Sequence, residues 1–438
     1  MKNKNHLYIF FLLVIFTLSF SCKKTGNGET ELAREIFNSL KGQKVTTYGW
    51  ADLANDGEGM TYANPDNFIL INDEKYPTAE KKYFAFIDAN YTTRPDIAAN
   101  GVISHNATHV NNNPKFIIIS GDIDLSNGRI TDDDNSHFDQ FGPAPDYRKV
   151  NGDIALNIGS NTTIIGINNA RIMFGGLVIS DGRNNIIIRN VTFWDTHGST
   201  AQDTDFFPNS KANATGLQIE DDPGGHSIWI NHCKFTDGTC SDLVRNYNHD
   251  GAFDIKFGRF ITVSWNEFTN HDKVMLVGSN DNTPASHPEL LNYINPTERQ
   301  ITLHHNYFHG VTQRMPRTRG TQMHVYNNYY NNIGNMDNGG SYMGLGANAQ
   351  FIVENNYFEP KVKPESKTIE YFNSAADQAY PPRLYYNGNN VPNSNSSWWG
   401  RTSTPMASLW TPGYDYPLDD NADLPVLIPG KAGPTLEF

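Results

Sequence analysis

The sequence has 438 residues but contains little charge and little apolar material for that length. Charged residues make up 18% of the chain, hydrophobic residues 38%, and only three residues are cysteine. A charged disordered chain would contain more charged residues, and a helical bundle would contain more hydrophobic residues. The remaining fraction is polar and neutral, since about fifty residues are Asn, 36 are Gly and 21 are Tyr. This composition favours β-structure.

Positive charge is also scarce. The chain has 34 Lys and Arg against 47 Asp and Glu, which gives a formal net charge of −13. Because binding to phosphates requires a basic surface, this balance argues against a nucleic-acid partner. A chain this acidic that binds an anionic ligand needs a local cluster of Lys and Arg, or a bound cation, at one place.

The N-terminus has the features of a targeting segment. Lys2 and Lys4 precede an apolar run over residues 7–20, which is too short to span a membrane stably and is typical of a secretory signal. Cys22 follows the small residue Ser21, as in a bacterial lipoprotein processing site. We therefore expect residues 1–22 to be a lipoprotein-type signal peptide. The mature protein would be exported and lipid-anchored through Cys22, at the outer membrane, the cell surface or in the periplasm; otherwise it is secreted.

The other two cysteines leave two possibilities open. If Cys22 carries a lipid, Cys233 and Cys240 remain as a pair. An exporting context permits a disulfide between them. The alternative is that both are small buried thiols.

The rest of the chain divides into a short leader and one large domain. We expect residues 23–45 to form a polar tether and a short helix, because Leu32, Ile36 and Leu40 have helical spacing and Gly42 follows as a stop. Residues 46–438 are expected to form a single β-domain. From about residue 360 its periodicity fades into an irregular tail rich in Pro, Ser and Asn, which we expect to lie across the outside.

Short β-like runs repeat through this domain. They cover residues 115–120, 162–167, 185–193, 227–235, 259–268, 300–308, 322–330 and 350–358. Most of the later runs end in Asn shortly before an aromatic residue, and the closing aromatic residues are Phe193, Phe235, Phe268, Phe308, Tyr330 and Phe358. The steps between these aromatic residues are unequal in length, and the shortest step is that from Phe308 to Tyr330. A shortest step of about 22 residues with variable excess indicates a solenoid whose loops extend from one side.

The repeat predicts an all-β parallel β-helix. Equivalent Asn side chains would hydrogen-bond along the axis, and equivalent aromatic rings would fill the interior. A β-propeller also repeats at about 40 residues, but its blades lack the ending in Asn before an aromatic.

Four segments depart from this structural repeat. They are residues 228–233, 250–256, 270–279 and 304–320. Within them lie five basic residues, namely Lys256, Lys273, Arg314, Arg317 and Arg319. In order and spacing the segments resemble the pectate lyases of polysaccharide lyase family one, which share a right-handed parallel β-helix. The resemblance runs from about residue 115 to residue 358.

The five basic residues suit the eliminative cleavage of a polyuronate. That reaction removes the proton α to a carboxylate, so the site must neutralise the carboxylate and stabilise an enediolate. By resemblance, Arg314 matches the arginine that abstracts the proton, and Lys273 and Arg319 match residues that hold substrate carboxylates and the transition state. Lys256 matches a further substrate contact, and Arg317 is expected to bind substrate as well. Because arginine normally stays protonated, the residue type alone indicates only a carboxylate clamp for Arg314.

Two acids indicate a calcium site. Asp250 and Asp254 match calcium ligands of the family, and carboxylate oxygens are the ligands that Ca²⁺ prefers. On a straight strand the two carboxylates would lie about 13 Å apart, so the chain must turn near Asp250 for both to reach one ion. The alternative is a structural acidic turn. A further family ligand falls near Thr215, which is no carboxylate, so calcium binds more weakly or recruits Glu220 or Asp221.

Two other pairs of residues in these segments are expected to have structural roles. Asn231 replaces an Asp common in the family before His232, which we expect to alter a structural hydrogen bond. His304 and His305 are adjacent, and neighbours on a strand point to opposite faces. A structural or stacking role is therefore expected for them in place of a transition-metal site.

Together these features predict a calcium-assisted pectate lyase, a monomer that cleaves α-1,4-polygalacturonate, an anionic polysaccharide, by β-elimination to unsaturated oligogalacturonides. One alternative is a pectin lyase or other polyuronate lyase with weak or no calcium dependence. A second is a non-catalytic lipoprotein that binds polyuronate. A hydrolase with paired carboxylates such as Asp221 and Asp222 would leave the basic cluster without a use.

Overall fold

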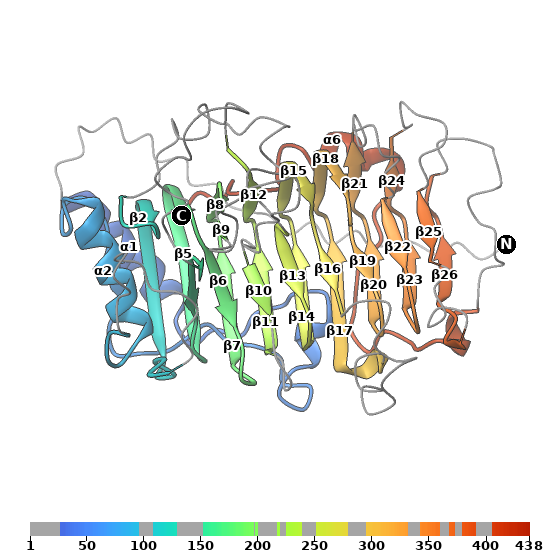
Figure 1. Ribbon diagram of the computed structural model, residues 1–438, viewed down its shortest axis with the longest axis horizontal. Coiled ribbons are helices and arrows are strands. Elements are labelled where there is room, and N and C mark those ends of the chain that lie inside the picture. Colours follow the sequence, from blue (N-terminus) through green and yellow to red (C-terminus); the bar gives the residue numbers. More distant parts are fainter. Residues whose placement is uncertain are drawn as a thin grey trace, which may run out of the picture.

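The computed structural model describes residues 27–95, 108–128, 152–196, 198–199, 217–219, 225–238, 251–278, 295–331, 342–359, 368–372, 379–390 and 405–438. Within them, strands dominate and pair almost entirely in parallel, as a sheet of 16 strands, a sheet of eight and one antiparallel pair. Figure 1 shows the strands as successive rungs stacked along the long axis.

The larger sheet contains β1 (Ile69–Ile71), β2 (Lys115–Asp124), β5 (Thr162–Met173), β7 (Asn184–Arg189), β8 (Thr192–Trp194), β11 (His226–Asn231), β12 (Lys234–Thr236), β14 (Gly258–Ser264), β15 (Glu267–Lys273), β17 (Arg299–His304), β18 (Tyr307–Gln313), β20 (Gln322–Tyr326), β21 (Tyr329–Asn331), β23 (Gln350–Glu354), β24 (Tyr357–Phe358) and β26 (Arg383–Asn387). The eight-stranded sheet contains β4 (Ala155–Asn157), β6 (Gly176–Ile179), β10 (Leu217–Ile219), β13 (Phe253–Ile255), β16 (Leu276–Val277), β19 (Arg317–Thr318), β22 (Met343–Leu345) and β25 (Ile369–Tyr371). The antiparallel pair is β3 (Gly152–Asp153) with β9 (Gly198–Ser199).

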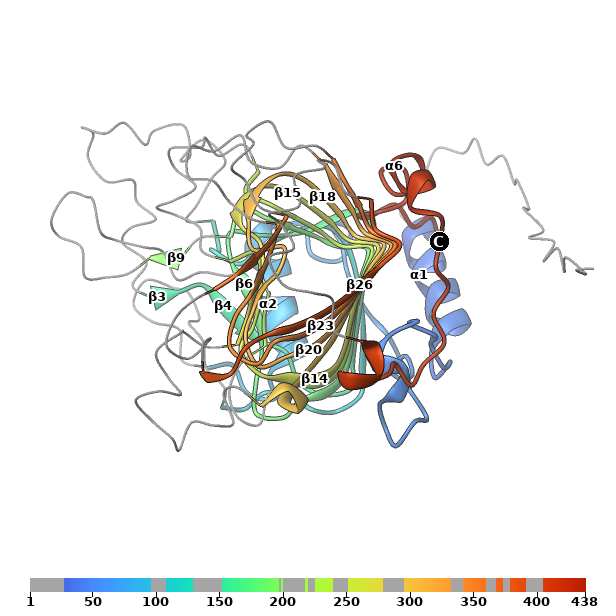
Figure 2. The same cartoon turned by 90° about the vertical axis from the view of Figure 1, so that its right-hand side faces the viewer.

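From β11 to β25 each coil supplies three strands, one to each side of the stack, whereas β5 covers two sides because it pairs with both β7 and β8. For example, β14, β15 and β16 make one coil, and β17, β18 and β19 pair with them in the next. Figure 2 looks along the stack and shows two sides meeting in a sharp corner. Residues at this corner adopt left-handed backbone angles, with φ between 48° and 60°; they are Asn190, His232, Trp265, His305, Asn327 and Asn355. Asn tolerates this conformation better than most residues, which accounts for part of the Asn content.

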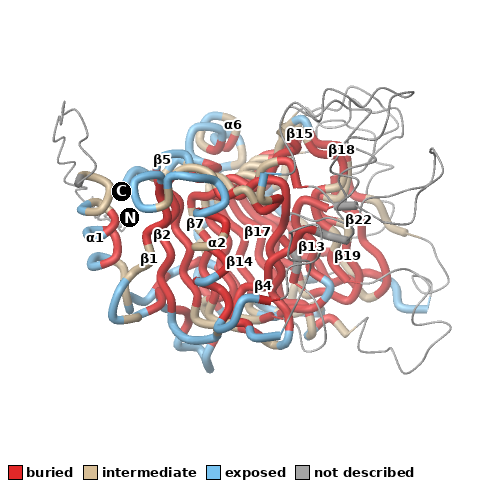
Figure 3. Tube along the Cα trace, turned by 60° about the vertical axis from the view of Figure 1, so that its left-hand side comes forward, coloured by how far each residue is buried: buried red, intermediate tan, exposed pale blue. Residues whose placement is uncertain are grey.

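The closing aromatic residues stack inside the coils as predicted. Strand register pairs each of the six with the next. Successive rings lie 4.7–5.0 Å apart and within 18° of parallel. All six are essentially excluded from solvent, and Figure 3 shows buried chain along the length of the stack. The prediction of a parallel β-helix is confirmed.

A buried asparagine ladder runs beside the aromatic stack. It consists of Asn266, Asn306, Asn328, Asn356 and Asn389, and each Nδ2 donates to the Oδ1 of the next at 2.9–3.0 Å. The same Oδ1 atoms also accept a backbone N–H from the preceding coil. Cys233 occupies the equivalent position one coil earlier, and its N–H donates to Asn266 Oδ1 at 2.8 Å. The predicted axial hydrogen bonding is therefore present.

Two helices lie at the N-terminal end of the stack. The predicted short helix is present as α1 (Asn27–Leu40), which packs Ala33, Ile36 and Phe37 onto the outer face of the first coils. Helix α2 (Ala79–Asn90) covers the open end of the interior, with Phe86 and Ile87 fully buried. The sequence analysis did not predict α2. An exposed first coil would leave apolar residues in water, so a solenoid requires such a cap.

The C-terminal segment over residues 405–438 runs back along the outside of the coils. Tyr414 bonds to Thr302, Asp419 bonds to His305, and Leu436 N–H donates to Asn190 Oδ1 at 3.0 Å. The segment includes the short helices η7 (Met406–Ser408), η8 (Asn421–Asp423) and α6 (Leu424–Leu427), and two further short helices, η1 (Trp50–Leu53) and η5 (Pro296–Glu298), lie elsewhere in the chain. No helix among the described residues is long and apolar enough to cross a membrane.

Candidate functional site

Strand register gathers the predicted site residues on the outer face of the eight-stranded sheet. Ile255 pairs with Val277, Leu276 with Arg317, and Arg317 with Gly344. Asp254 therefore lies in the same column as Arg317, two coils away. Since neighbouring strands are about 4.8 Å apart, their α-carbons are separated by about 10 Å.

A second column runs parallel to the first, two residues further along each strand. It contains Lys256, Gly278, Arg319, Gly346 and Phe372, and each coil is joined to the next by backbone hydrogen bonds of 2.8–3.0 Å at this level. Gly278 has φ +86°, and a Cβ there would meet the carbonyl oxygen of Arg319 at 2.7 Å. The position between Lys256 and Arg319 is thus kept free of a side chain.

Lys273 ends β15 and Arg314 follows β18, and each lies three residues before a strand of the eight-stranded sheet. Val274 N–H donates to Gln313 O at 3.1 Å, and Met275 N–H donates to Arg314 O at 2.7 Å, so the two segments lie side by side. Three successive coils therefore carry the five predicted cations. The structure brings together all five, although they come from three separate segments of the sequence.

The conformation of Arg314 is unusual for its residue type. It has φ +63°, in the left-handed region, and it precedes the cis peptide between Met315 and Pro316. Among the described residues its Nε is buried and has no hydrogen-bond partner. Left-handed non-glycine residues and orphaned buried donors both cost free energy, and both concentrate where function requires them.

The chain turns at Gly251, as a shared metal site requires. A Cβ on Gly251 would lie 2.5 Å from Asp254 Oδ2, so the backbone at Gly251 lies directly beside that carboxylate. Asp254 is 8% exposed, and its Oδ1 accepts the Leu276 N–H at 2.7 Å. The carboxylate of Asp254 at the edge of the basic face supplies oxygen ligands of the kind that a hard cation prefers.

The other expected metal ligands cannot be placed. Asp250, Thr215, Glu220 and Asp221 lie outside the described residues. Within the residues that the structure describes, no three His, Cys, Asp or Glu side chains form a group able to hold a metal ion.

A buried ion pair supports the strand that ends at Lys273. The Nδ1 of His271 bonds to Asp237, and its Nε2 lies 2.9 Å from Lys273 O. Because a carboxylate and a carbonyl oxygen only accept hydrogen bonds, both ring nitrogens must donate, and the ring is an imidazolium. Burial opposes this charge, but the carboxylate of Asp237 outweighs it and raises the pKa of His271.

The remaining histidine and cysteine predictions have mixed outcomes. His304 and His305 have structural partners, but their rings touch, with Nδ1 atoms 2.8 Å apart, because the chain turns at His305. The expectation that they point to opposite faces was wrong. Asn231 bonds to Ser264 and Arg189, consistent with a structural position. Cys233 is a buried free thiol, and burial raises its pKa to about 12; Cys240 lies outside the described residues.

One feature of this face was absent from the sequence analysis. The Phe372 ring lies 4.2 Å from Arg317 Cζ and 5.6 Å from Arg319 Cζ. Its position far along the sequence from these arginines gives no local signal, and only the coil register identifies it.

Comparison with known proteins identifies the family of the chain. Residues 89–405 match the family profile described as pectate lyase. A pectate trisaccharide-lyase from Thermotoga sp. (strain RQ2) is 39% identical over 189 residues, which cover 40% of this chain and 41% of the relative. A pectate lyase from Bacillus subtilis is 31% identical over 304 residues, or 64% of this chain and 65% of the relative. Less than two thirds of either relative is therefore spanned.

Solved structures show the same fold. A thermostable pectate lyase superposes with a TM-score of 0.62 and 27% sequence identity, covering 90% of this chain and 99% of the other. A pectate lyase bound to a hexasaccharide superposes with a TM-score of 0.63 at 24% identity, covering 90% and 99% of the two chains.

Proposed function

The chain belongs to the pectate lyase family, and we propose that it cleaves unesterified polygalacturonate by β-elimination. The observation that carries the proposal is the placement of five cations on three neighbouring coils of an acidic protein. Guanidinium and ammonium groups in this arrangement can neutralise several carboxylates of one polyuronate chain. The products are unsaturated oligogalacturonides.

The five basic residues divide into three roles in the proposed reaction. Arg317, Arg319 and Lys256 bind substrate carboxylates, which makes the α-proton easier to remove. In its neutral guanidine form Arg314 accepts that proton, a role that rests on family membership, and the left-handed backbone at this position is of the kind that concentrates at functional residues. The electron pair of the broken C–H bond forms the new double bond, and the glycosidic oxygen leaves with the aglycone. Lys273 stabilises the negative charge that develops on the enediolate.

Calcium is part of the proposal. Asp254 and Asp250 would hold the ion, as the turn at Gly251 supports. When bound, the ion would supply positive charge that makes the α-proton of the substrate more acidic. Asp254→Asn keeps an acceptor for Leu276 N–H but removes the charge. We expect it to raise the calcium concentration for half-maximal activity about tenfold.

An absorbance assay tests the activity. Polygalacturonate, highly methylated pectin and alginate are each incubated with the protein, with and without chelator, and unsaturated uronides are followed in the ultraviolet. We expect product from polygalacturonate that disappears with chelator and returns with calcium. Preference for methylated pectin with no effect of chelator would instead establish a pectin lyase, and binding without any product would establish a polyuronate-binding protein.

We also propose that the protein is an exported, monomeric lipoprotein anchored at Cys22. This proposal rests on the apolar run and on Cys22 itself. A Cys22→Ala variant should move from the membrane fraction to the soluble exported fraction, and equal membrane retention of both proteins would contradict it.

A further inference from the structure

An aromatic ring lies between the two arginines at the C-terminal end of the basic face. Phe372 follows β25, and its N–H donates to Leu345 O at 2.9 Å. Its ring reaches back across β22 to β19, where its centroid lies 4.2 Å from Arg317 Cζ and 5.6 Å from Arg319 Cζ. The ring is half-buried, so it stands at the edge of the proposed substrate surface.

Gly344 makes room for this ring. It pairs with Arg317 in the strand register, and a Cβ at Gly344 would lie 2.5 Å from Phe372 Cζ. The same Cβ would lie 3.4 Å from Arg317 Cγ, so the stem of the arginine also passes over the glycine. Any larger residue would push the ring away from both guanidinium groups.

We propose that Phe372 is a positioning residue, which holds the guanidinium groups of Arg317 and Arg319 in the orientation that binds consecutive substrate carboxylates. A guanidinium group attracted to a ring loses the freedom to rotate before substrate arrives. Less entropy is then lost when its N–H groups bind a carboxylate. The inference rests on the proposed function, since it assumes that these arginines bind a polyuronate.

The test compares Phe372→Leu, Phe372→Tyr and wild type. Leucine keeps apolar volume but removes the ring face, so we expect KM for polygalacturonate to rise about fivefold to tenfold while kcat changes by less than about twofold. Tyrosine keeps the ring and should leave KM within about twofold of wild type. A merely structural role would lower stability without this division between KM and kcat.

Gly344→Ala provides a second route that leaves Phe372 in the chain. Its Cβ must displace the ring, so we expect the same rise in KM. The double variant with Phe372→Leu should be no worse than Phe372→Leu alone, because both changes remove one interaction. Additive effects of the two changes, or an unchanged KM in Phe372→Leu, would overturn the inference.

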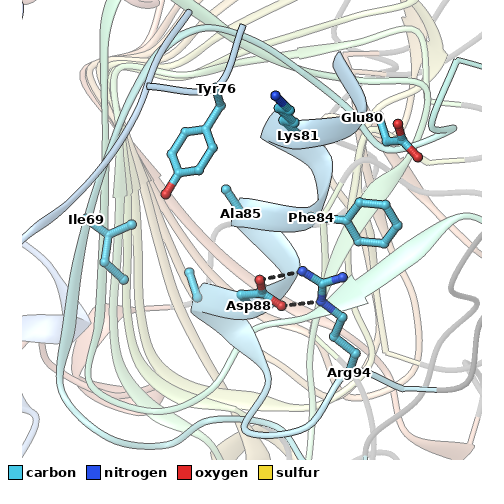
Figure 4. A pocket seen from close by; sticks show the side chains of 9 residues that line it. Ile69, Tyr76, Glu80, Lys81, Phe84, Ala85, Asp88 and Arg94 are labelled. Atoms are coloured by element: carbon cyan, nitrogen blue, oxygen red, sulfur yellow. Dashed lines mark hydrogen bonds and ion pairs between the residues drawn. The ribbon is translucent and has the colours of Figure 1, made fainter. Parts of the chain in front are cut away.

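Phe84→Leu is a matched control far from the basic face. Figure 4 shows Phe84 on α2 beside Arg94, whose Cζ lies 4.4 Å from the ring centroid and which also pairs with Asp88. The Phe84→Leu variant removes the same kind of contact between an arginine and an aromatic ring, and it should leave KM for polygalacturonate unchanged. An equal rise in KM for Phe84→Leu would show that the effect is not specific to the basic face and would overturn the inference.

Affinity electrophoresis in gels containing polygalacturonate separates the two proposals. Retarded migration measures carboxylate binding whether or not turnover occurs. If wild type is retarded but forms no unsaturated product, the proposed function fails, while weaker retardation of Phe372→Leu still supports the positioning role. If wild type forms product and Phe372→Leu is retarded equally, the positioning role fails alone.

Discussion

Two outer faces of the same coils carry polar side chains, and the side chains on the two faces have different roles. One is the basic face of the eight-stranded sheet. The other, here called the clamp face, is formed by His304, His324, Tyr326 and Glu354 on β17, β20 and β23. The N-terminal segment around Thr47 and the C-terminal tail around Tyr414 and Tyr416 cover it.

Hydrogen bonds within the clamp face join elements far apart in sequence. His304 Nε2 donates to Thr47 O at 2.8 Å, because a carbonyl oxygen only accepts. His324 lies between the Tyr414 hydroxyl at 3.0 Å and Glu354 at 3.3 Å. The Tyr416 hydroxyl donates to the same carboxylate at 3.0 Å. Covered polar groups of this kind stabilise the fold, whereas the basic face has Arg314 Nε without a partner among the described residues.

The difference shows that the covering segments determine the use of a face. Both faces present outward positions of short parallel strands at the same spacing between coils. On the clamp face the partners of the polar groups are supplied by the chain itself. On the basic face we propose that substrate carboxylates also bind the cations. Changes on the two faces should therefore separate activity from stability.

The largest expected effect is at Arg314. Replacing it with Ala should lower kcat/KM on polygalacturonate about 10³-fold, the scale for loss of a group that acts on the transition state. Arg314→Gly should lose the same activity but raise the free energy of unfolding by about 1 kcal/mol, since glycine relieves the left-handed strain at φ +63°. Kinetics and urea unfolding measure both.

Arg94→Ala is the control, because Arg94 lies on the N-terminal cap and pairs with Asp88. If Arg314→Gly lost stability but kept its activity, the assignment of activity to the basic face and of stability to the clamp face would be wrong.

The next effect is expected on the clamp face. His324 is fully buried, and His324→Ala leaves Tyr414 and Glu354 without their shared partner. We expect it to lower the free energy of unfolding by about 3 kcal/mol, from the cavity and the unsatisfied groups together. Below its unfolding transition the variant should keep wild-type kcat/KM. A large loss of activity in the folded variant would show that the clamp face also supports the site.

The smallest effect is the response of the clamp face to acid. Burial lowers the pKa of His304 well below its usual value, with His305 adding to the shift, and burial also lowers the pKa of His324. In the unfolded chain both titrate near their ordinary value of about 6.5. Below that pH the unfolded state binds protons that the folded state does not, so stability falls as pH falls, by at most about 1.4 kcal/mol per pH unit for each histidine.

Urea unfolding at pH 7.5, 6.5 and 5.5 measures this dependence. His271 acts in the opposite direction, since its pKa is raised and its contribution is lost only as pH rises. Substitution of His304 by Asn should flatten the acid slope. Substitution of the exposed His109 by Asn should leave it unchanged, and a slope that is the same in all three proteins would contradict the assignment.

The sequence was informative where a local pattern repeats. The closing aromatic residues predicted the internal stack, and the Asn residues before them predicted the ladder, because each position recurs with the same two neighbours in every coil. The five cations were found because they interrupt that repeat. Helix α2 was missed since it occurs once, at the end of the solenoid, and no repeat marks it.

Contacts between coils were harder to predict. The contact of Phe372 with Arg317 and Arg319 could be predicted only by aligning their strands across the intervening loops. That alignment is not evident from the sequence, because the steps between coils differ in length. The same variation concealed that Gly344 lies beside Arg317. Partners in a solenoid are neighbours in register, and register depends on loop lengths that no local rule gives.

The sequence alone determined the architecture and the kind of chemistry. Its repeating Asn and aromatic positions require a stacked coil, and its clustered cations in an acidic chain require an anionic ligand. The tertiary structure decided which face the chain itself covers, and we propose that substrate binds at the other. That choice depends on where the N-terminal segment and the C-terminal tail lie, because a polar side chain covered by chain is bonded internally, while one left at the surface can bind substrate.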